Sequence, residues 1–548
     1  GLVRLGYAQV ARPWRATAGA AGVSGRWQGL LLTSLRNGHE IGNKGSNDAQ
    51  DSTRTTPNPV DYDNRYLLGK ALFSLDDHHQ FGLTLESQNR HQRTEVYSAR
   101  AVPPLASTSV LDLDTNDRIS RERVSFEHRF LNSAAALFQR AETRVYRQEA
   151  SVRQFSAEDR NTAADRTRDN LYEQKVTGLS TQFESRVQGP VRQRIIYGLD
   201  WSRAEITGVR DGTVAPFGET FPTRPFPDTD YTLLGAFVQS ELELGALTVI
   251  PALRFDHYEL SPSTAGYTGG AVTKLSDQAV TPRLGVVWRL QPAFSPYFQW
   301  ARGFKAPTPD QVNNGFSNLA SGYMSVGNPE LKPERAESIE LGFRGSAGDW
   351  RYSMAAFDNR YEDFIDQELV GGSATPADPS IYQYINLSNA RIHGLEGRTE
   401  WRISRAWSAK AGFAWAHGRS ELDGVRTPLD SVNPLKLVLG LRYDTGVWGA
   451  RADVVHSRAK ERDRVDTLPL GPGGSEVEQF TTPSWTTLDL GVFWKPVRNL
   501  TLVANLNNVF DTRYWRWSDS RGLAATTTIS EAFTAPGRNL QLSLRYDL

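Results

Sequence analysis

The stretch Arg538–Leu548, RNLQLSLRYDL, alternates apolar and polar side chains over its whole length. Successive side chains of a β-strand point to opposite faces, so this period of two predicts a strand with one apolar and one polar face. The same alternation recurs at 500–507, 488–494, 437–443 and 339–343. The chain is therefore predicted to be all-β, although a soluble sandwich would alternate in the same way.

The spacing of the tight turns separates a barrel from a sandwich. Ten short connections lie near Gly25, Asp77, Asn132, Gly189, Gly245, Pro292, Ala347, Ser404, Thr445 and Val497. Most intervals between them span about 40 to 60 residues and hold a strand, a long polar segment and a second strand. Eleven such hairpins predict a transmembrane antiparallel β-barrel of about 22 strands, with short periplasmic turns and long extracellular loops.

The composition of the 548 residues excludes several classes of protein. No run approaches the roughly 18 apolar residues of a membrane-spanning helix. The absence of Cys excludes disulfide scaffolds and Cys-based metal sites, and 62 basic against 62 acidic residues give no net charge that would attract nucleic acid. The sequence contains no GxSxG, HExxH or P-loop motif, so we expect no enzyme activity.

Aromatic residues lie near the ends of several predicted strands, where the interfacial girdles of membrane barrels are found. They are Trp407, Trp448, Trp485, Trp494 and Tyr546. Ordinary packing within a sheet is the alternative explanation for any one of them.

Residues 303–334 read GFKAPTPDQVNNGFSNLASGYMSVGNPELKPE. Phe304-Lys305-Ala306-Pro307 and Asn328-Pro329-Glu330-Leu331 resemble the paired FRAP and NPNL motifs of haem and haemoglobin receptors among the TonB-dependent outer-membrane receptors, the haemoglobin/transferrin/lactoferrin receptor family. The segments Leu506–Trp515 and Asn389–Trp401 resemble further strands of that family. By the turn count, residues 303–334 form the seventh external loop.

The resemblance extends over essentially all of residues 1–548. It implies a monomeric outer-membrane receptor that takes up haem, either free or from haemoglobin or another carrier. Such a receptor would contact the lipid bilayer and lipopolysaccharide and would bind no nucleic acid. Uptake would be energised by TonB, and haem would be the transported ligand, with no intrinsic cofactor. The family also has an N-terminal plug and a TonB box, which these residues lack, and no signal peptide is recognisable. We therefore expect a processed, trimmed or truncated chain; a barrel without a plug would be an open diffusion pore. A ferric-siderophore receptor is a further alternative.

Haem is a flat apolar disc with two carboxylates and an iron that requires axial ligands. Many relatives place a His between the two motifs, but Lys305–Asn328 contains none, which leaves Tyr323 as the candidate axial ligand to the haem iron. Phe316 would stack on the porphyrin and Met324 would pack beside it. The alternative role of Tyr323 is loop packing.

The motif residues themselves are expected to be structural. Phe304, Ala306 and Pro307 would end a strand and set the loop, while Asn328 and Pro329 would open a turn that Glu330 and Leu331 complete.

Arginines are frequent in the third and fourth external units, and they include Arg160, Arg166 and Arg168, with acidic residues between them. The favoured interpretation is a polar lumen wall with cross-strand charge pairs. The alternative is a patch that faces haem propionates or lipopolysaccharide.

The predicted topology can be tested by proteolysis of intact cells. Added protease should cleave only within long loops such as Gly371–Tyr384 and Asp466–Thr482. Cleavage from outside at Asp76–His79, identified by mass spectrometry, would show that the orientation is inverted.

Overall fold

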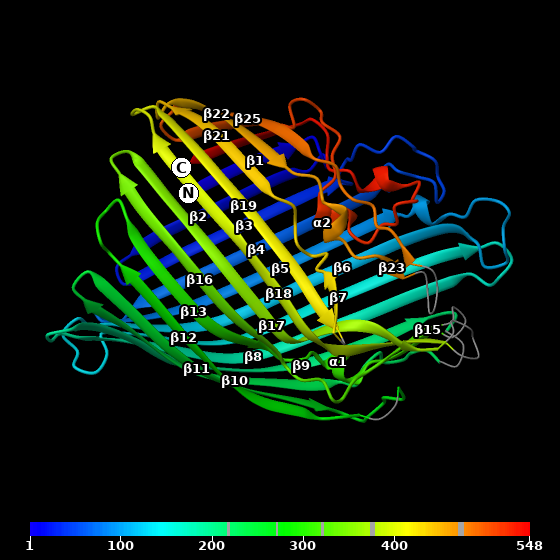
Figure 1. Ribbon diagram of the computed structural model, residues 1–548, viewed down its shortest axis with the longest axis horizontal. Coiled ribbons are helices and arrows are strands. Elements are labelled where there is room, and N and C mark those ends of the chain that lie inside the picture. Colours follow the sequence, from blue (N-terminus) through cyan, green and yellow to red (C-terminus); the bar gives the residue numbers. More distant parts are fainter. Residues whose placement is uncertain (216–219, 270–271, 319–322, 373–378, 423, 470–475) are drawn as a thin grey trace.

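The first and last strands pair with each other and close the sheet into a cylinder (Figure 1). In this computed structural model, β1 and β27 run antiparallel from Leu2 opposite Asp547 to Ala8 opposite Gln541. The structure describes residues 1–548 except 216–219, 270–271, 319–322, 373–378, 423 and 470–475. The main sheet has 25 strands, of which β14, β15 and β20 are short strands of the loops, and the other 22 form the closed antiparallel barrel.

The barrel strands are β1 (Leu2–Ala8), β2 (Trp14–Ser24), β3 (Trp27–His39), β4 (Val60–Ser74), β5 (His79–Glu95), β6 (Val110–Leu131), β7 (Arg140–Arg160), β8 (Arg166–Val187), β9 (Arg192–Gly212), β10 (Thr229–Leu244), β11 (Leu247–Pro262), β12 (Leu275–Trp288), β13 (Ser295–Lys305), β16 (Glu334–Ala347), β17 (Trp350–Gly371), β18 (Ser380–Arg402), β19 (Trp407–Leu422), β21 (Lys436–Asp444), β22 (Trp448–Ser457), β25 (Trp485–Val497), β26 (Leu500–Asn507) and β27 (Asn539–Asp547). The loops carry α1 (Pro309–Asn313), β14 (Gly315–Asn318), β15 (Tyr323–Val326), β20 (Val425–Pro428), β23 (Leu468–Pro469), β24 (Glu476–Val477) and α2 (Trp517–Ser520). Short 3₁₀ turns lie at Tyr97–Ala99, Arg462–Arg464 and Ser530–Phe533.

All ten predicted short turns lie at one rim of the barrel, and the long loops leave from the other. At Gly25 and Gly245 the chain reverses with φ of +56° and +64°, a conformation that glycine adopts without steric cost. The predicted strand number and the position of the seventh loop are confirmed. The loop itself is 306–333, slightly shorter than predicted, because β13 continues to Lys305 and β16 begins at Glu334.

The two faces of the wall differ as the alternation predicts. Leu542 and Leu544 of β27 are on the outer face, beside Leu502 and Val492 of neighbouring strands, around an apolar surface. The inner face carries charge networks. The Glu127 carboxylate, which is 9% exposed, lies 3.2 Å from Arg144, 3.4 Å from Arg129 and 3.5 Å from Lys70. A polar lumen and an apolar exterior are the pattern of a membrane barrel.

Aromatic rings in contact with one another line the wall near the short turns. Trp350 stacks on Trp401, and Tyr443 lies between Trp407 and Trp448, each pair with centroids 4.9 Å apart. Trp485 differs from the other predicted girdle residues: it lies at the opposite, long-loop rim and packs on Tyr514 of the last loop, 4.4 Å between centroids.

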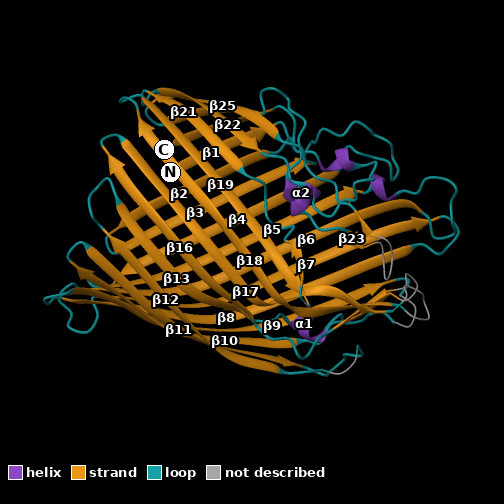
Figure 2. Cartoon of the chain, in the orientation of Figure 1, coloured by secondary structure: helices purple, strands orange, loops and turns teal. Residues whose placement is uncertain are grey.

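The helices are few and short (Figure 2). Within the described part of the chain, none of them has the length and apolar character needed to cross a bilayer.

Adjacent residues in the middle of β27 provide a test of the two faces. Leu542→Arg places a cation in lipid and should lower the free energy of unfolding in liposomes by about 2–4 kcal/mol. Ser543 faces the lumen, so Ser543→Arg should lower the free energy of unfolding much less. Urea titration with gel-mobility detection of the folded barrel measures both, and equal costs would contradict the assignment of the faces.

Candidate functional site

The seventh loop begins and ends on neighbouring strands. β13 pairs with β16 so that Lys305 is opposite Glu334, and Lys305 Nζ is 3.0 Å from Glu334 Oε1. The same carboxylate oxygen accepts a hydrogen bond from the backbone N–H of Ile365 at 3.2 Å. The two sequence motifs, more than twenty residues apart in the chain, are thereby brought side by side at the rim.

From these ends the loop folds inward onto the barrel wall. Val312 of α1 and Leu331 of the second motif are 1% and 2% exposed, and they pack with Tyr258, Leu260 and Ile365 in a small apolar core. Phe304 and Ala306 of the first motif pack against this core, and Pro307 is fully buried. Burial of this apolar surface fixes the base of the loop.

The second motif attaches the loop to β18. Asn328 donates from Nδ2 to the Tyr384 carbonyl at 2.9 Å, and its Oδ1 accepts from the backbone of Glu330 at 3.0 Å. Asn386 both donates to and accepts from the backbone of Lys332, each at 2.9 Å. Pro329 and Glu330 are both exposed.

Neighbouring loops hold the other side of the seventh loop. The Tyr267 hydroxyl donates to the Asn313 carbonyl at 2.9 Å, and the Gly315 N–H donates to the Pro225 carbonyl at 2.8 Å. Burial raises the pKa of Tyr172 on β8 and of Tyr384 on β18, and the Asp310 carboxylate of α1 raises both further. The Asp310 carboxylate of α1 is therefore close enough to act on side chains of both β8 and β18.

The hairpin β14–β15 carries Tyr323. Its β15 strand also pairs in parallel with β18, with Tyr323 opposite Ser380. Ser325 is 6% exposed and accepts hydrogen bonds from Asn314 and Gln367, at 3.0 and 2.9 Å, whereas Tyr323 is 36% exposed. The hairpin is thus anchored near its base, and the phenol is accessible.

The other two predicted haem contacts are placed differently by the hairpin. Met324 follows Tyr323 directly in the strand and therefore points to the opposite face, so the two side chains do not line one surface. The backbone of Phe316 is opposite Ser325 in β14, but its side chain, like residues 319–322, lies outside the described residues.

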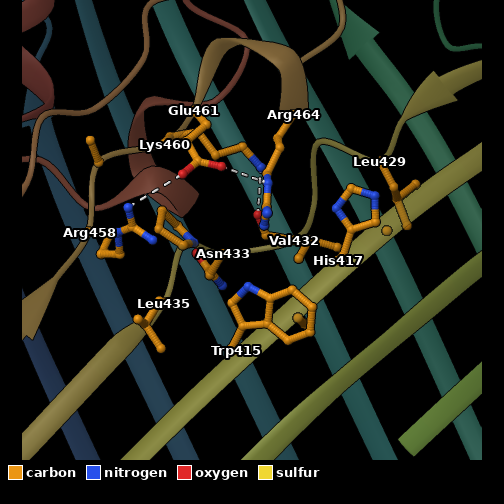
Figure 3. A pocket seen from close by; sticks show the side chains of 14 residues that line it. Trp415, His417, Leu429, Val432, Asn433, Leu435, Arg458, Lys460, Glu461 and Arg464 are labelled. Atoms are coloured by element: carbon orange, nitrogen blue, oxygen red, sulfur yellow. Dashed lines mark hydrogen bonds and ion pairs between the residues drawn. The ribbon is translucent and has the colours of Figure 1, made fainter.

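A separate pocket lies beneath the loops after β19 and β22 (Figure 3). Trp415 and His417 of β19 point toward residues 429–435 and 458–464, and Glu461 lies between Arg458 and Arg464 at 3.7 and 2.9 Å. Its cavity of about 30 Å³ holds a water molecule or two and not a porphyrin. The mouth around the seventh loop is therefore the stronger candidate site.

Sequence reasoning did not identify the wall that receives this loop. Arg254, Asp256, Tyr258 and Leu260 alternate along β11 on its inner face, and Tyr258 and Leu260 are fully buried. The sequence did contain a signal. Among the residues of β11 that face the lumen, charged side chains are followed by apolar ones at the level where the seventh loop packs.

The anchoring of the loop can be tested at Leu331. Leu331→Ala removes a side chain from the small core and should lower the free energy of local unfolding of the loop by about 2–4 kcal/mol. Limited proteolysis should then cut within 306–333 faster than in the parent protein, with the barrel intact. Glu330→Ala, at the neighbouring exposed position, is the matched control, and equal rates for both variants would contradict the role assigned to Leu331.

Comparison with known proteins agrees with this architecture. The family described as TonB dependent receptor-like, beta-barrel, matches residues 13–509. The solved structures of the copper transporter OprC and of the FrpB iron transporter from Neisseria meningitidis superpose over 100% of this chain and 80% of theirs, with TM-scores of 0.74 and 0.73 and identities of 16% and 15%. At these identities the likeness concerns the fold alone.

Curated relatives match over a shorter stretch. A probable hemoglobin and hemoglobin-haptoglobin-binding protein 4 of Haemophilus influenzae is 28% identical over 273 residues, 45% of this chain and 27% of that protein. A hemoglobin-haptoglobin utilization protein B of Neisseria meningitidis serogroup C is 24% identical over 296 residues, 47% of this chain and 36% of that protein. The match therefore spans about a quarter to a third of the length of these relatives. With a family match over residues 13–509 and a closed barrel of 22 strands, this chain belongs to the TonB-dependent receptors of the outer membrane, a family of receptors and transporters.

Proposed function

We propose that this protein takes up haem, free or from haemoglobin or another haem carrier, with energy delivered through TonB. The observation that carries the proposal is the accessible phenol of Tyr323 on an anchored loop at the mouth of the barrel. Ferric haem accepts a phenolate as axial ligand, and among the residues between the two motifs only Tyr323 has a side chain of that kind.

The surroundings of Tyr323 support this assignment. The hairpin is fixed by Ser325 and by pairing with β18, so the phenol is held by a folded element and does not depend on ligand binding for its position. A preorganised donor loses less conformational entropy when the ligand binds. The names of the curated relatives, which state haemoglobin binding, point to the same class of ligand.

The donor is tested by Tyr323→Phe, which removes the hydroxyl and leaves the ring to pack. Purified protein reconstituted with haemin should show the absorption of a tyrosinate-ligated ferric porphyrin. The variant should lose that spectrum and bind haemin at least about tenfold more weakly, or 1.4 kcal/mol. Tyr546→Phe, in β27 and also 36% exposed, is the matched control.

The alternatives give different results. A ferric-siderophore receptor would bind its ferric ligand with no haem-type absorption, and a passive pore would carry a large, steady and unselective current in planar bilayers. An unchanged haemin spectrum and affinity in Tyr323→Phe would contradict the axial ligand. No binding of haemin by the parent protein would contradict the proposed function.

A further inference from the structure

Three arginines gather on the inner wall at the long-loop ends of β7 and β8. Even-numbered residues of β7 face the lumen from Arg144, which pairs with Glu127, up to Glu158 and Arg160. The register of β7 with β8 then places Arg166 opposite Glu158 and Arg168 opposite Ser156, on the same face. Arg160, Arg166 and Arg168 form the arginine cluster.

The acidic residues near the arginine cluster do not balance its positive charge. Arg166 Nη2 is 2.6 Å from Glu158 Oε2, but Arg160 Nε is 3.7 Å from the other carboxylate oxygen, beyond hydrogen-bond distance. The Nε atoms of both arginines are buried and have no hydrogen-bond acceptor among the described residues. One carboxylate therefore faces three guanidinium groups.

Arg168 is the arginine of the cluster whose positive charge is least balanced by carboxylates. It makes neither a hydrogen bond nor an ion pair with any residue that the structure describes, and it is exposed. By contrast, Arg153, on the outer face of β7, is bonded to Asp169. The guanidinium donors of Arg168 are therefore accessible to an acceptor that a ligand supplies.

Burial of Arg160 makes water a poor substitute for that acceptor. Its side chain is 9% exposed, as little as that of Glu158 at 10%. An arginine has five N–H donors in a planar fork, which matches the two oxygens of a carboxylate. The wall thus offers guanidinium donors, among them the Nε of Arg160 and of Arg166, that have no acceptor among the described residues.

Tyr323 is within electrostatic reach of this wall. Partial desolvation lowers the pKa of Arg168, its neighbour Arg166 lowers it further, and Glu158 and Tyr323 act in the opposite direction. Both residues lie at the long-loop rim, outside the membrane-spanning part of the barrel. The hairpin that pairs with β18 therefore brings its phenol toward the arginines of the facing wall.

We propose that the arginine cluster binds the carboxylate groups of the transported porphyrin while Tyr323 holds its iron. This inference rests on the proposed function and adds a second, separable contact. The charge-assisted bonds would orient the disc with its acidic edge toward β7 and β8. They would also distinguish a dicarboxylate porphyrin from its neutral diester.

The experiment uses the full chain and three probes: haemin, metal-free mesoporphyrin IX and mesoporphyrin IX dimethyl ester. Mesoporphyrin has no iron, so its binding reports the carboxylates without the axial ligand. Arg168→Gln should weaken the binding of haemin and of mesoporphyrin by about tenfold and leave the weak binding of the diester unchanged. Arg168→Lys should retain part of the affinity, and Arg153→Gln should match the parent protein.

The outcomes separate this inference from the proposed function. If Tyr323→Phe abolishes the haem spectrum but Arg168→Gln binds mesoporphyrin as the parent does, the arginine site is wrong and haem uptake stands. If Arg168→Gln weakens mesoporphyrin binding and Tyr323→Phe changes nothing, the carboxylate site stands and the iron ligand is wrong. If the parent protein binds neither haemin nor mesoporphyrin, both are wrong.

A stability measurement excludes a purely structural role. Because Arg168 has no partner among the described residues, Arg168→Gln should leave the urea midpoint of the folded barrel unchanged or raise it. A clear decrease would show that Arg168 supports the wall itself, and this would overturn its assignment to a ligand.

Discussion

The pairing of β1 with β27 is the constraint on which the whole molecule depends. Lipid offers no hydrogen-bond partners, so an open edge in the bilayer would leave a row of backbone groups unsatisfied, each at a cost of several kcal/mol. Closing the sheet removes that edge and requires the strands to tilt around a wide lumen. The lumen is then wet, and a wet lumen permits the charge networks that a dry core would exclude.

The candidate site depends on a local departure from that polarity. Near the long-loop rim the inner wall changes from the Arg254 and Asp256 pair to the buried Tyr258 and Leu260, and there the seventh loop packs. The loop is held at both ends by the β13–β16 pairing, from below by the small core and from the side by β18. A binding loop anchored in this way can present a tyrosine in a defined position while its tip faces solvent.

Charge in the mouth is arranged unevenly. Arg254 has the carboxylates of Asp200 and Asp256 beside it, whereas within the described residues the arginine cluster forms ion pairs with Glu158 alone. This imbalance faces the hairpin that carries Tyr323. The proposed iron ligand on one element and the arginine cluster on the opposing wall would together suit a flat ligand that has a metal centre and an acidic edge.

The sequence by itself determined the barrel, because the period of two and the position of each tight turn are local properties of the chain. The alternation in Arg538–Leu548 and the turn at Gly25 needed no distant partner, so the strand count, the two faces and the place of the seventh loop were predictable. Tertiary structure alone decided the rest. Trp485 packs on Tyr514, the strand that carries Tyr323 pairs with β18, and Arg168 forms no ion pair with any described residue; each depends on which segments from distant parts of the chain meet at the rim. Contacts of this kind arise from register and loop packing, which no local pattern of side chains encodes.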